Sequence, residues 1–186
     1  MNIFHLDKDP VVAAQMMCDK HVVKMIVEYA QLMSTAHRVL DGELYLDKTK
    51  NGRNIKRWRL KPTAQEQLLY KASHVNHPSN IWARDNDKNY RWLYKHFQAL
   101  CGEYTHRYGR VHATEEKLSS LLWWAPKNIN LVGEMTKFVQ AMPDHVKMHD
   151  PVEGYRNYYI KEKSYMAKWT NRAAPNWFQQ QSVGVV

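Results

Sequence analysis

A crowded group of titratable side chains, Asp19-Lys20-His21, lies near the start of the chain. It places a carboxylate, an amine and an imidazole on consecutive residues, and enzymes use this set to move protons or to activate water. Asp19 could act as a base, Lys20 supplies the amine, and His21 could assist in moving a proton. We therefore take these three residues as catalytic candidates.

Polar residues continue from His21 along one face of a predicted helix. Their spacings of three and four residues put them on a single face, and much of the opposite circumference is apolar. Two interpretations stay open. The face could be a wet outer surface with Lys24 and Glu28 as an i,i+4 ion pair, or it could line a cleft in which Glu28 is catalytic and Arg38 binds nucleic acid. The stripe consists of His21, Lys24, Glu28, Gln31, Thr35 and Arg38.

A second set of candidates lies in the segment NHPSNIWAR, residues 76–84. Asn76 or His77 caps a helix whose first residue is Pro78, and this structural role is sufficient to explain the motif. His77 and Arg84 could nevertheless face the same cleft. His77 is then a catalytic candidate, and Arg84 is a candidate contact to nucleic acid.

The 10 histidines raise the question of a metal site. No HExxH or Cys/His spacing supports one, and His149-Asp150, which resembles the doublet of HD phosphohydrolases, is explained by Asp150 as a helix cap. The chain also lacks a GxxxxGK[ST] loop, a GxGxxG turn and a GxSxG elbow, which disfavours an NTPase, a Rossmann dehydrogenase and a standard esterase. We expect no metal and no cofactor.

The positive charge of the chain is concentrated in one short stretch. Residues 48–61 contain seven Lys or Arg residues and no Asp or Glu, whereas the net charge of the whole chain is +9. Cations neutralise phosphates and an indole can stack on an unpaired base, so we predict nucleic-acid binding without sequence readout. A solvated basic face is the alternative. The predicted contacts in this stretch are Arg53, Lys56, Arg57, Trp58, Arg59 and Lys61.

The elements that position these groups are mainly helical. Asp9 and Asp150 each precede a proline, as helix caps do, and they begin predicted helices over residues 10–40 and 151–170. A third long helix is predicted over residues 86–104. Shorter helices are predicted over residues 79–84, 114–124 and 133–140.

One stretch departs from the helical pattern. Residues 43–61 place Asn51-Gly52 between two arms with β-forming residues, which indicates a hairpin, with a basic loop as the alternative. The predicted fold is therefore all-α. We expect a single compact helical domain over residues 1–186 with one basic β-hairpin or loop insert at 43–61.

Length and composition limit the protein class. A chain of 186 residues fits one domain, and 44% hydrophobic with 24% charged residues excludes wholesale disorder. No apolar stretch approaches the roughly 18 residues of a membrane span, and the start lacks a secretory pattern. The 2 cysteines form no disulfide framework. We expect a cytoplasmic protein whose partner is nucleic acid and not a membrane. The oligomeric state stays open.

Several segments together resemble a family of small, mostly uncharacterised phage proteins. The segments are CDKHVVKM, AQLMSTAHR, NHPSNIWAR, NYRWLYKHFQALCGEYTHRYGRVH, AMPDHVK and DPVEGYRNYYIKEK, and they span nearly the whole chain. More remotely, an N-terminal helix, a following NHP and a basic helical body resemble the pyrimidine-dimer DNA glycosylases of phages. That resemblance implies base excision by an N-terminal amine and an Arg-Glu pair, at the place where this chain has Asp19-Lys20-His21.

We favour an enzyme that acts on nucleic acid, DNA before RNA, by base excision or base modification in a phage-infected bacterial cell. In one mechanism Asp19 activates water or stabilises an oxocarbenium-like sugar. In the other, Lys20 or the terminal amine attacks C1′, which gives a lyase. Both require the target nucleotide to be extruded. Two other functions stay open: a non-enzymatic nucleic-acid binder that inhibits host machinery, and a hydrolase or transferase acting on small nucleotides.

Overall fold

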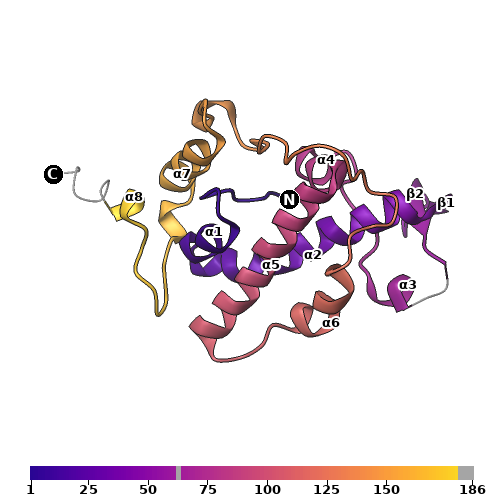
Figure 1. The fold of residues 1–186 in the computed structure, drawn as a ribbon, viewed down its shortest axis with the longest axis horizontal. Helices are drawn as coiled ribbons and strands as arrows, with labels where there is room; N and C mark the ends of the chain where they lie inside the picture. The colour runs from indigo at the N-terminus through magenta and orange to yellow at the C-terminus, as the bar shows by residue number, and fades with distance from the viewer. Residues whose placement is uncertain (62–63, 180–186) are drawn as a thin grey trace.

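The computed structural model describes residues 1–61 and 64–179, and helices dominate this part of the chain (Figure 1). Apart from one small hairpin the fold is all-α, as predicted. The helices are α1 Pro10–Met16, α2 Asp19–Asp41, α3 Ala64–Leu68, α4 Pro78–Asp85, α5 Asp87–Tyr108, α6 Ala113–Leu122, α7 Pro151–Glu162 and α8 Asn176–Gln179, with short 3-10 turns η1 Asp144–Val146 and η2 Ser164–Met166.

Two long helices, α2 and α5, form the centre of the fold, and α5 crosses in front of α2 in Figure 1. Their facing sides supply most of the fully buried residues, such as Tyr29 and Met33 from α2 and Leu93 and Phe97 from α5. Burying such a side chain stabilises the fold by about 1.5–3 kcal/mol. α2 therefore has one face in the core along its first half and is buried on nearly all sides from Tyr29 to Arg38.

Three of the predicted helices differ from those in the structure. The helix expected over 10–40 is two helices, because Met17 and Cys18 are extended and fully buried between α1 and α2. The helix expected over 133–140 is absent, because residues 131–137 are exposed and Gly133 has φ 98°, so no apolar face could be buried. The helix expected over 151–170 ends at Glu162.

The basic insert is a hairpin, as the sequence predicts. β1 (Glu43–Lys48) pairs antiparallel with β2 (Asn54–Arg59), and Gly52 in the connecting turn has φ 76°, which suits glycine. Gly42 joins α2 to β1, and a Cβ there would lie 2.4 Å from the Arg38 carbonyl oxygen. The hairpin therefore leaves α2 abruptly and stands at one end of the molecule (Figure 1).

The N-terminal segment is held against α2 and the later part of the chain. The Phe4 amide donates to the Tyr29 hydroxyl at 3.1 Å, and the Asn2 side chain donates to the Ala141 carbonyl at 2.9 Å. Ile3 and Leu6 are fully buried. Among the described helices, none combines the length and apolar character needed to cross a bilayer.

Candidate active site

A polar cavity of about 240 Å³ lies where the N-terminal segment crosses the first half of α2. Helical spacing brings His21, Lys24 and Glu28 to the same wall of this cavity, because they are three and four residues apart. The other walls come from the N-terminal segment and from the region of α7. We call this cavity the amine pocket; it is lined by Met1, Asn2, Phe4, His21, Lys24, Met25, Glu28, Ala141, Tyr158 and Lys163.

An amine and a carboxylate face each other in the amine pocket. The Met1 amine lies 3.8 Å from Glu28 Oε2, and Lys24 Nζ lies 3.2 Å from Glu28 Oε1. The Glu28 side chain is only 15% exposed, so its charge is screened less than that of a surface carboxylate. An amine beside a carboxylate is a nucleophile with a proton acceptor within reach.

Several hydrogen bonds fix the position of this amine. Asn2 Oδ1 accepts from the Ile3 amide at 2.9 Å and lies 2.7 Å from the Tyr155 hydroxyl. Asn80 Nδ2 lies 3.9 Å from the Met1 sulfur. The first residues are therefore held from both sides, so the amine is presented to the pocket in a defined place.

His21 is a neutral member of the amine pocket at physiological pH. Burial lowers its pKa to about 3, and the positive charges of Lys163 and Lys24 contribute to the shift. Its ring stacks on Phe4 with 4.3 Å between ring centroids, and its Nδ1 contacts the Tyr159 hydroxyl. Burial keeps the Tyr159 pKa well above its ordinary value, so this hydroxyl retains its proton beside the neutral His21 ring.

His77 lies close enough to the amine pocket to feel its charges. It caps α4, with Nδ1 accepting from the Ser79 amide at 3.2 Å, as the sequence predicts for the NHP motif. Burial lowers the pKa of His77, and the Met1 amine and His74 lower it further, against the opposing charge of Glu28. His77 does not line the amine pocket, and the bond that it makes is the cap of α4.

The predicted trio Asp19-Lys20-His21 is not brought together. Successive helical residues point about 100° apart, and only His21 of the three lines the amine pocket. Lys20 is exposed. Asp19 is occupied elsewhere: Arg107 Nη1 lies 2.8 Å from its Oδ1, and the Thr170 hydroxyl donates to its Oδ2 at 2.7 Å. Burial raises the Asp19 pKa, but the hydrogen bonds from Thr170 and Arg107 outweigh that effect and lower it overall.

Arg38, which the sequence suggested as a contact to nucleic acid, is buried inside the protein. Its guanidinium is buried, and all five of its N–H groups donate to protein acceptors. No donor is left for a phosphate, so we do not include Arg38 among the proposed DNA contacts. Its partners are the carbonyls of Trp58, Glu66, Leu69 and Tyr70 and the carboxylate of Glu66.

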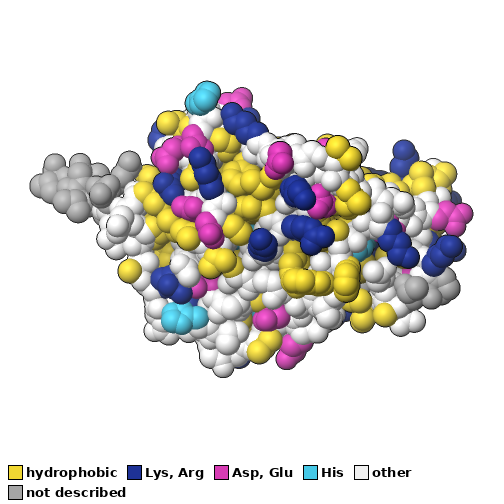
Figure 2. Space-filling model, viewed as in Figure 1, with side chains coloured by type: hydrophobic (Ala, Val, Ile, Leu, Met, Phe, Trp, Pro, Cys, Tyr) yellow, Lys and Arg dark blue, Asp and Glu magenta, His cyan; other side chains and the backbone are white. Residues whose placement is uncertain are grey.

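The other cations predicted to bind nucleic acid are spread over the hairpin, and Lys and Arg side chains stand out at this end of the molecule (Figure 2). Arg53, Lys56, Arg59 and Lys61 are exposed, and Arg59 lies over the Tyr45 ring at 4.8 Å. Arg57 is half-buried, with Nε 3.9 Å from Asp47 Oδ2.

A groove of about 330 Å³ separates the hairpin from residues 72–76. Lys56 and Trp58 line one side, and His74 lines the other. Arg84 lies outside this groove, on α4, where burial lowers its pKa and its Nη1 has no hydrogen-bond partner among the described residues. The groove thus combines an indole and a cation at the protein surface.

α2 connects the amine pocket to the hairpin. Glu28 lines the pocket, and Arg38, ten residues later, bonds the Trp58 carbonyl at 3.0 Å. With a rise of 1.5 Å per residue, these two positions are about 15 Å apart along the helix axis.

Three residues of the amine pocket carried no sequence signal for a site. Phe4 precedes the predicted helix, and Tyr158 and Lys163 follow about 130 residues after Glu28. Lys163 lies over the Tyr158 ring at 4.7 Å, and Phe4 and Tyr158 are nearly parallel. Only chain folding brings them together. Among the described residues, no group of three or more His, Cys, Asp or Glu side chains is arranged to hold a metal ion.

A match to a known protein family covers most of the residues that line the amine pocket. The family described as pyrimidine dimer DNA glycosylase matches residues 1–116, which is 116 of 186 residues. The match covers the N-terminal segment, α2 and the hairpin, but not Tyr158 and Lys163. No curated protein and no solved structure matches the chain. The match supports DNA glycosylase-like activity in general, with DNA as the substrate. The chain belongs to the pyrimidine dimer DNA glycosylase family.

Proposed function

We propose that this protein excises damaged pyrimidines from DNA, with the Met1 amine as nucleophile and Glu28 as the proton-transfer group. The observation that carries the proposal is the 3.8 Å approach of the Met1 amine to Glu28 Oε2 inside a polar cavity. The family match, whose description names pyrimidine dimers, supports the substrate class.

The geometry supports an imine mechanism. An ammonium has no free electron pair, so Glu28 first accepts a proton from the Met1 amine. The amine nitrogen then bonds to C1′ as the glycosidic bond breaks, and the base leaves with the electron pair and takes the proton from Glu28. Glu28 then takes a second proton from the nitrogen and passes it to O4′ as the C1′–O4′ bond opens, which gives the imine. Removal of a proton from C2′ next to the imine then expels the 3′ phosphate with its electron pair and cleaves the strand.

This mechanism is favoured over the water-activating alternative because of what Asp19 contacts. The Asp19 carboxylate accepts from Arg107 and from Thr170, so its oxygens are already committed. Lys20 is exposed and does not line the pocket. The Met1 amine and Glu28 are the pair positioned to perform covalent chemistry.

We further propose that the hairpin binds the DNA backbone without reading its sequence. In this proposal Arg53, Lys56, Arg57, Arg59 and Lys61 neutralise phosphates, and the exposure of all of them except the half-buried Arg57 supports it. Trp58 lines the groove beside Lys56, so its indole could stack on an unpaired base. Base stacking would compensate part of the cost of extruding a nucleotide, which is a few kcal/mol.

Borohydride trapping tests the imine directly. DNA containing one thymine dimer, or one abasic site, is incubated with the protein and borohydride, and peptide mass spectrometry locates the adduct. We expect the adduct on the Met1 nitrogen with damaged DNA and none with undamaged DNA. Inserting one glycine between Met1 and Asn2 moves the amine by about 3.5 Å and should abolish trapping.

Glu28→Gln tests the proton-transfer role of the carboxylate. We expect excision to slow by about 10²–10⁴-fold, because general acid–base catalysis contributes that much. Glu116→Gln, at an exposed position of α6, is the matched control and should behave like the wild type. An adduct on Lys20, or full activity in Glu28→Gln, would refute the proposed site. DNA binding without any trapping would favour the non-enzymatic binder.

A further inference from the structure

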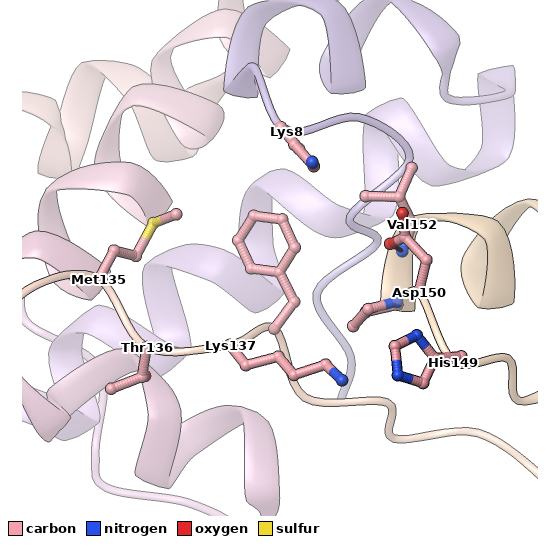
Figure 3. Close-up of a pocket in the computed structure, with 9 residues that line it drawn as sticks. Lys8, Met135, Thr136, Lys137, His149, Asp150 and Val152 are labelled. Carbon is pink, nitrogen blue, oxygen red and sulfur yellow. Dashed lines mark hydrogen bonds between the residues drawn. The ribbon is translucent and has the colours of Figure 1, made fainter.

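A second cavity, of about 420 Å³, lies between the N-terminal segment and the beginning of α7 (Figure 3). We call it the α7 pocket. Except for Lys8, its lining lies beyond residue 116, outside the family match, so the family does not account for it. The lining residues are Lys8, Met135, Thr136, Lys137, Phe138, His149, Asp150, Pro151 and Val152.

The floor of the α7 pocket is apolar and contains an aromatic ring in a fixed position. Phe138 stacks on the fully buried His5, with 3.8 Å between centroids and planes 15° apart. Trp92 packs against the same ring at 5.0 Å. Because these neighbours already hold Phe138, a flat ligand could stack on it with little loss of side-chain freedom.

The rim of the α7 pocket is cationic. Lys8 and Lys137 form no ion pair with any described carboxylate, and in Figure 3 they approach the pocket from different chain segments, with His149 beside the Lys137 amine. Asp150 is the acidic residue of the lining, and its Oδ1 accepts from the Val152 amide at 2.9 Å as the cap of α7. The pocket therefore offers two amines whose charges are not neutralised by a partner.

We propose that the α7 pocket binds a nucleotide, with its base on Phe138 and its phosphate between Lys8 and Lys137. The volume lies within the range of roughly 300–1,000 Å³ that is typical of small-molecule sites. An apolar aromatic floor and a cationic rim match the two parts of a nucleotide, the flat ring and the phosphate. The nucleotide could be free or part of a DNA strand, since both offer the same chemistry.

This site is separate from the proposed chemistry at Met1. Phe4 lines the amine pocket, whereas the next residue, His5, supports Phe138 from below. The linings of the two cavities have no residue in common. Loss of one site should therefore leave the other measurable.

Calorimetric titration of the whole protein tests the proposal. Thymidine 5′-monophosphate should bind, and thymidine or inorganic phosphate alone should bind at least about tenfold more weakly, because each lacks half of the interaction. Lys8→Ala and Lys137→Ala should each weaken binding about tenfold, and Phe138→Leu should weaken it several-fold. Lys168→Ala, at an exposed lysine remote from the lining, is the control.

Comparison with a 5′-phosphorylated oligothymidine distinguishes the two sources of nucleotide. Tighter binding of the oligonucleotide, lost in Lys137→Ala, assigns the pocket to a DNA strand, whereas equal affinities assign it to free nucleotide. Two results would overturn the proposal. One is an affinity for the monophosphate that is unchanged in all three variants, Lys8→Ala, Lys137→Ala and Phe138→Leu. The other is inorganic phosphate that binds as tightly as the monophosphate. Far-UV circular dichroism checks that each variant folds.

Discussion

Asp19 and Glu28 show that the partners of a carboxylate decide its role. Both lie on α2, and both looked able to act as a base. Asp19 is held by Arg107 and Thr170, and these hydrogen bonds lower its pKa despite the opposing effect of burial. Glu28 instead meets the Met1 amine in the amine pocket. Glu28, which does not belong to the Asp19-Lys20-His21 group, is therefore the better candidate for catalysis.

Two buried histidines should make the protein sensitive to mild acid. Burial lowers the pKa of His21 to about 3 and that of His96 to about 4, although the Pro10 carbonyl opposes the shift at His96. The unfolded chain, with histidine pKa values near 6.5, therefore takes up protons first as the pH falls. Stability should be constant above pH 6.5 and fall below it. We expect a loss of about 2 kcal/mol per histidine between pH 6.5 and 5.

Urea unfolding at a series of pH values measures this loss. His96→Gln keeps an amide donor for the Pro10 carbonyl and cannot titrate, so its stability should fall less steeply over the same range. His106→Gln, which removes an exposed histidine, should retain the wild-type slope. A wild-type stability that does not change between pH 7 and 5 would contradict the assignment of His21 and His96 as neutral buried groups.

At the level of elements, α2 performs two tasks with its two halves. Its first half contributes His21, Lys24 and Glu28 to the amine pocket. Its second half fastens the hairpin, because Arg38 bonds the Trp58 carbonyl and the Glu66 carboxylate. The polar stripe of the sequence is thus neither a wet surface nor one continuous cleft.

The hairpin should account for much of the salt dependence of DNA binding. Arg53→Gln with Arg59→Gln removes two exposed charges without touching the core. Each lost phosphate contact should reduce the slope of log K against log salt concentration by about 0.9, so the double variant should lose about 1.8. The measurement is fluorescence anisotropy with duplex DNA between low and physiological salt.

Lys168→Gln with Lys161→Gln, at two exposed lysines away from the hairpin, is the charge-matched control. It should leave the slope close to that of the wild type. An equal loss in both double variants would show that net charge, and not the hairpin, determines binding to DNA.

At the scale of the whole molecule, the amine pocket joins three segments that are far apart in the sequence. Tyr155 of α7 is fully buried, and its hydroxyl lies 2.7 Å from Asn2 Oδ1 and 2.9 Å from the Val139 carbonyl oxygen. Phe4 packs edge-on against the same ring at 5.9 Å. The later part of the chain thereby holds the residues next to the proposed nucleophile.

Tyr155→Phe should loosen this attachment while preserving the packed ring. The variant removes the hydroxyl's contacts with Asn2 and the Val139 carbonyl oxygen, and each buried hydrogen bond lost costs about 1 kcal/mol of unfolding free energy. We expect the rate of imine trapping to fall several-fold even where the variant is fully folded, because the amine becomes less well placed. Tyr165→Phe, at an exposed tyrosine outside the lining of the amine pocket, is the control. Unchanged trapping in Tyr155→Phe would show that the amine is positioned by other contacts.

Local features were predictable from the sequence because their causes are local. The caps at Asp9, His77 and Asp150, the turn at Gly52 and the helical periodicity each depend on neighbouring residues, and the structure confirms them. The split of the first long helix at Met17 was not predictable, because it depends on burial against the rest of the fold.

The sequence by itself determined a mostly helical chain with a basic hairpin and the group of residues on α2 from which a site could be drawn. Only the tertiary structure decided which of them meet. Asp19 forms an ion pair with Arg107 and is not part of the amine pocket. Arg38 donates its hydrogen bonds to Glu66 and several carbonyls. The N-terminal amine lies beside Glu28. These contacts join residues up to about 90 positions apart, and a side chain's charge, donors and pKa depend on such neighbours. Periodicity along the chain contains no information about them.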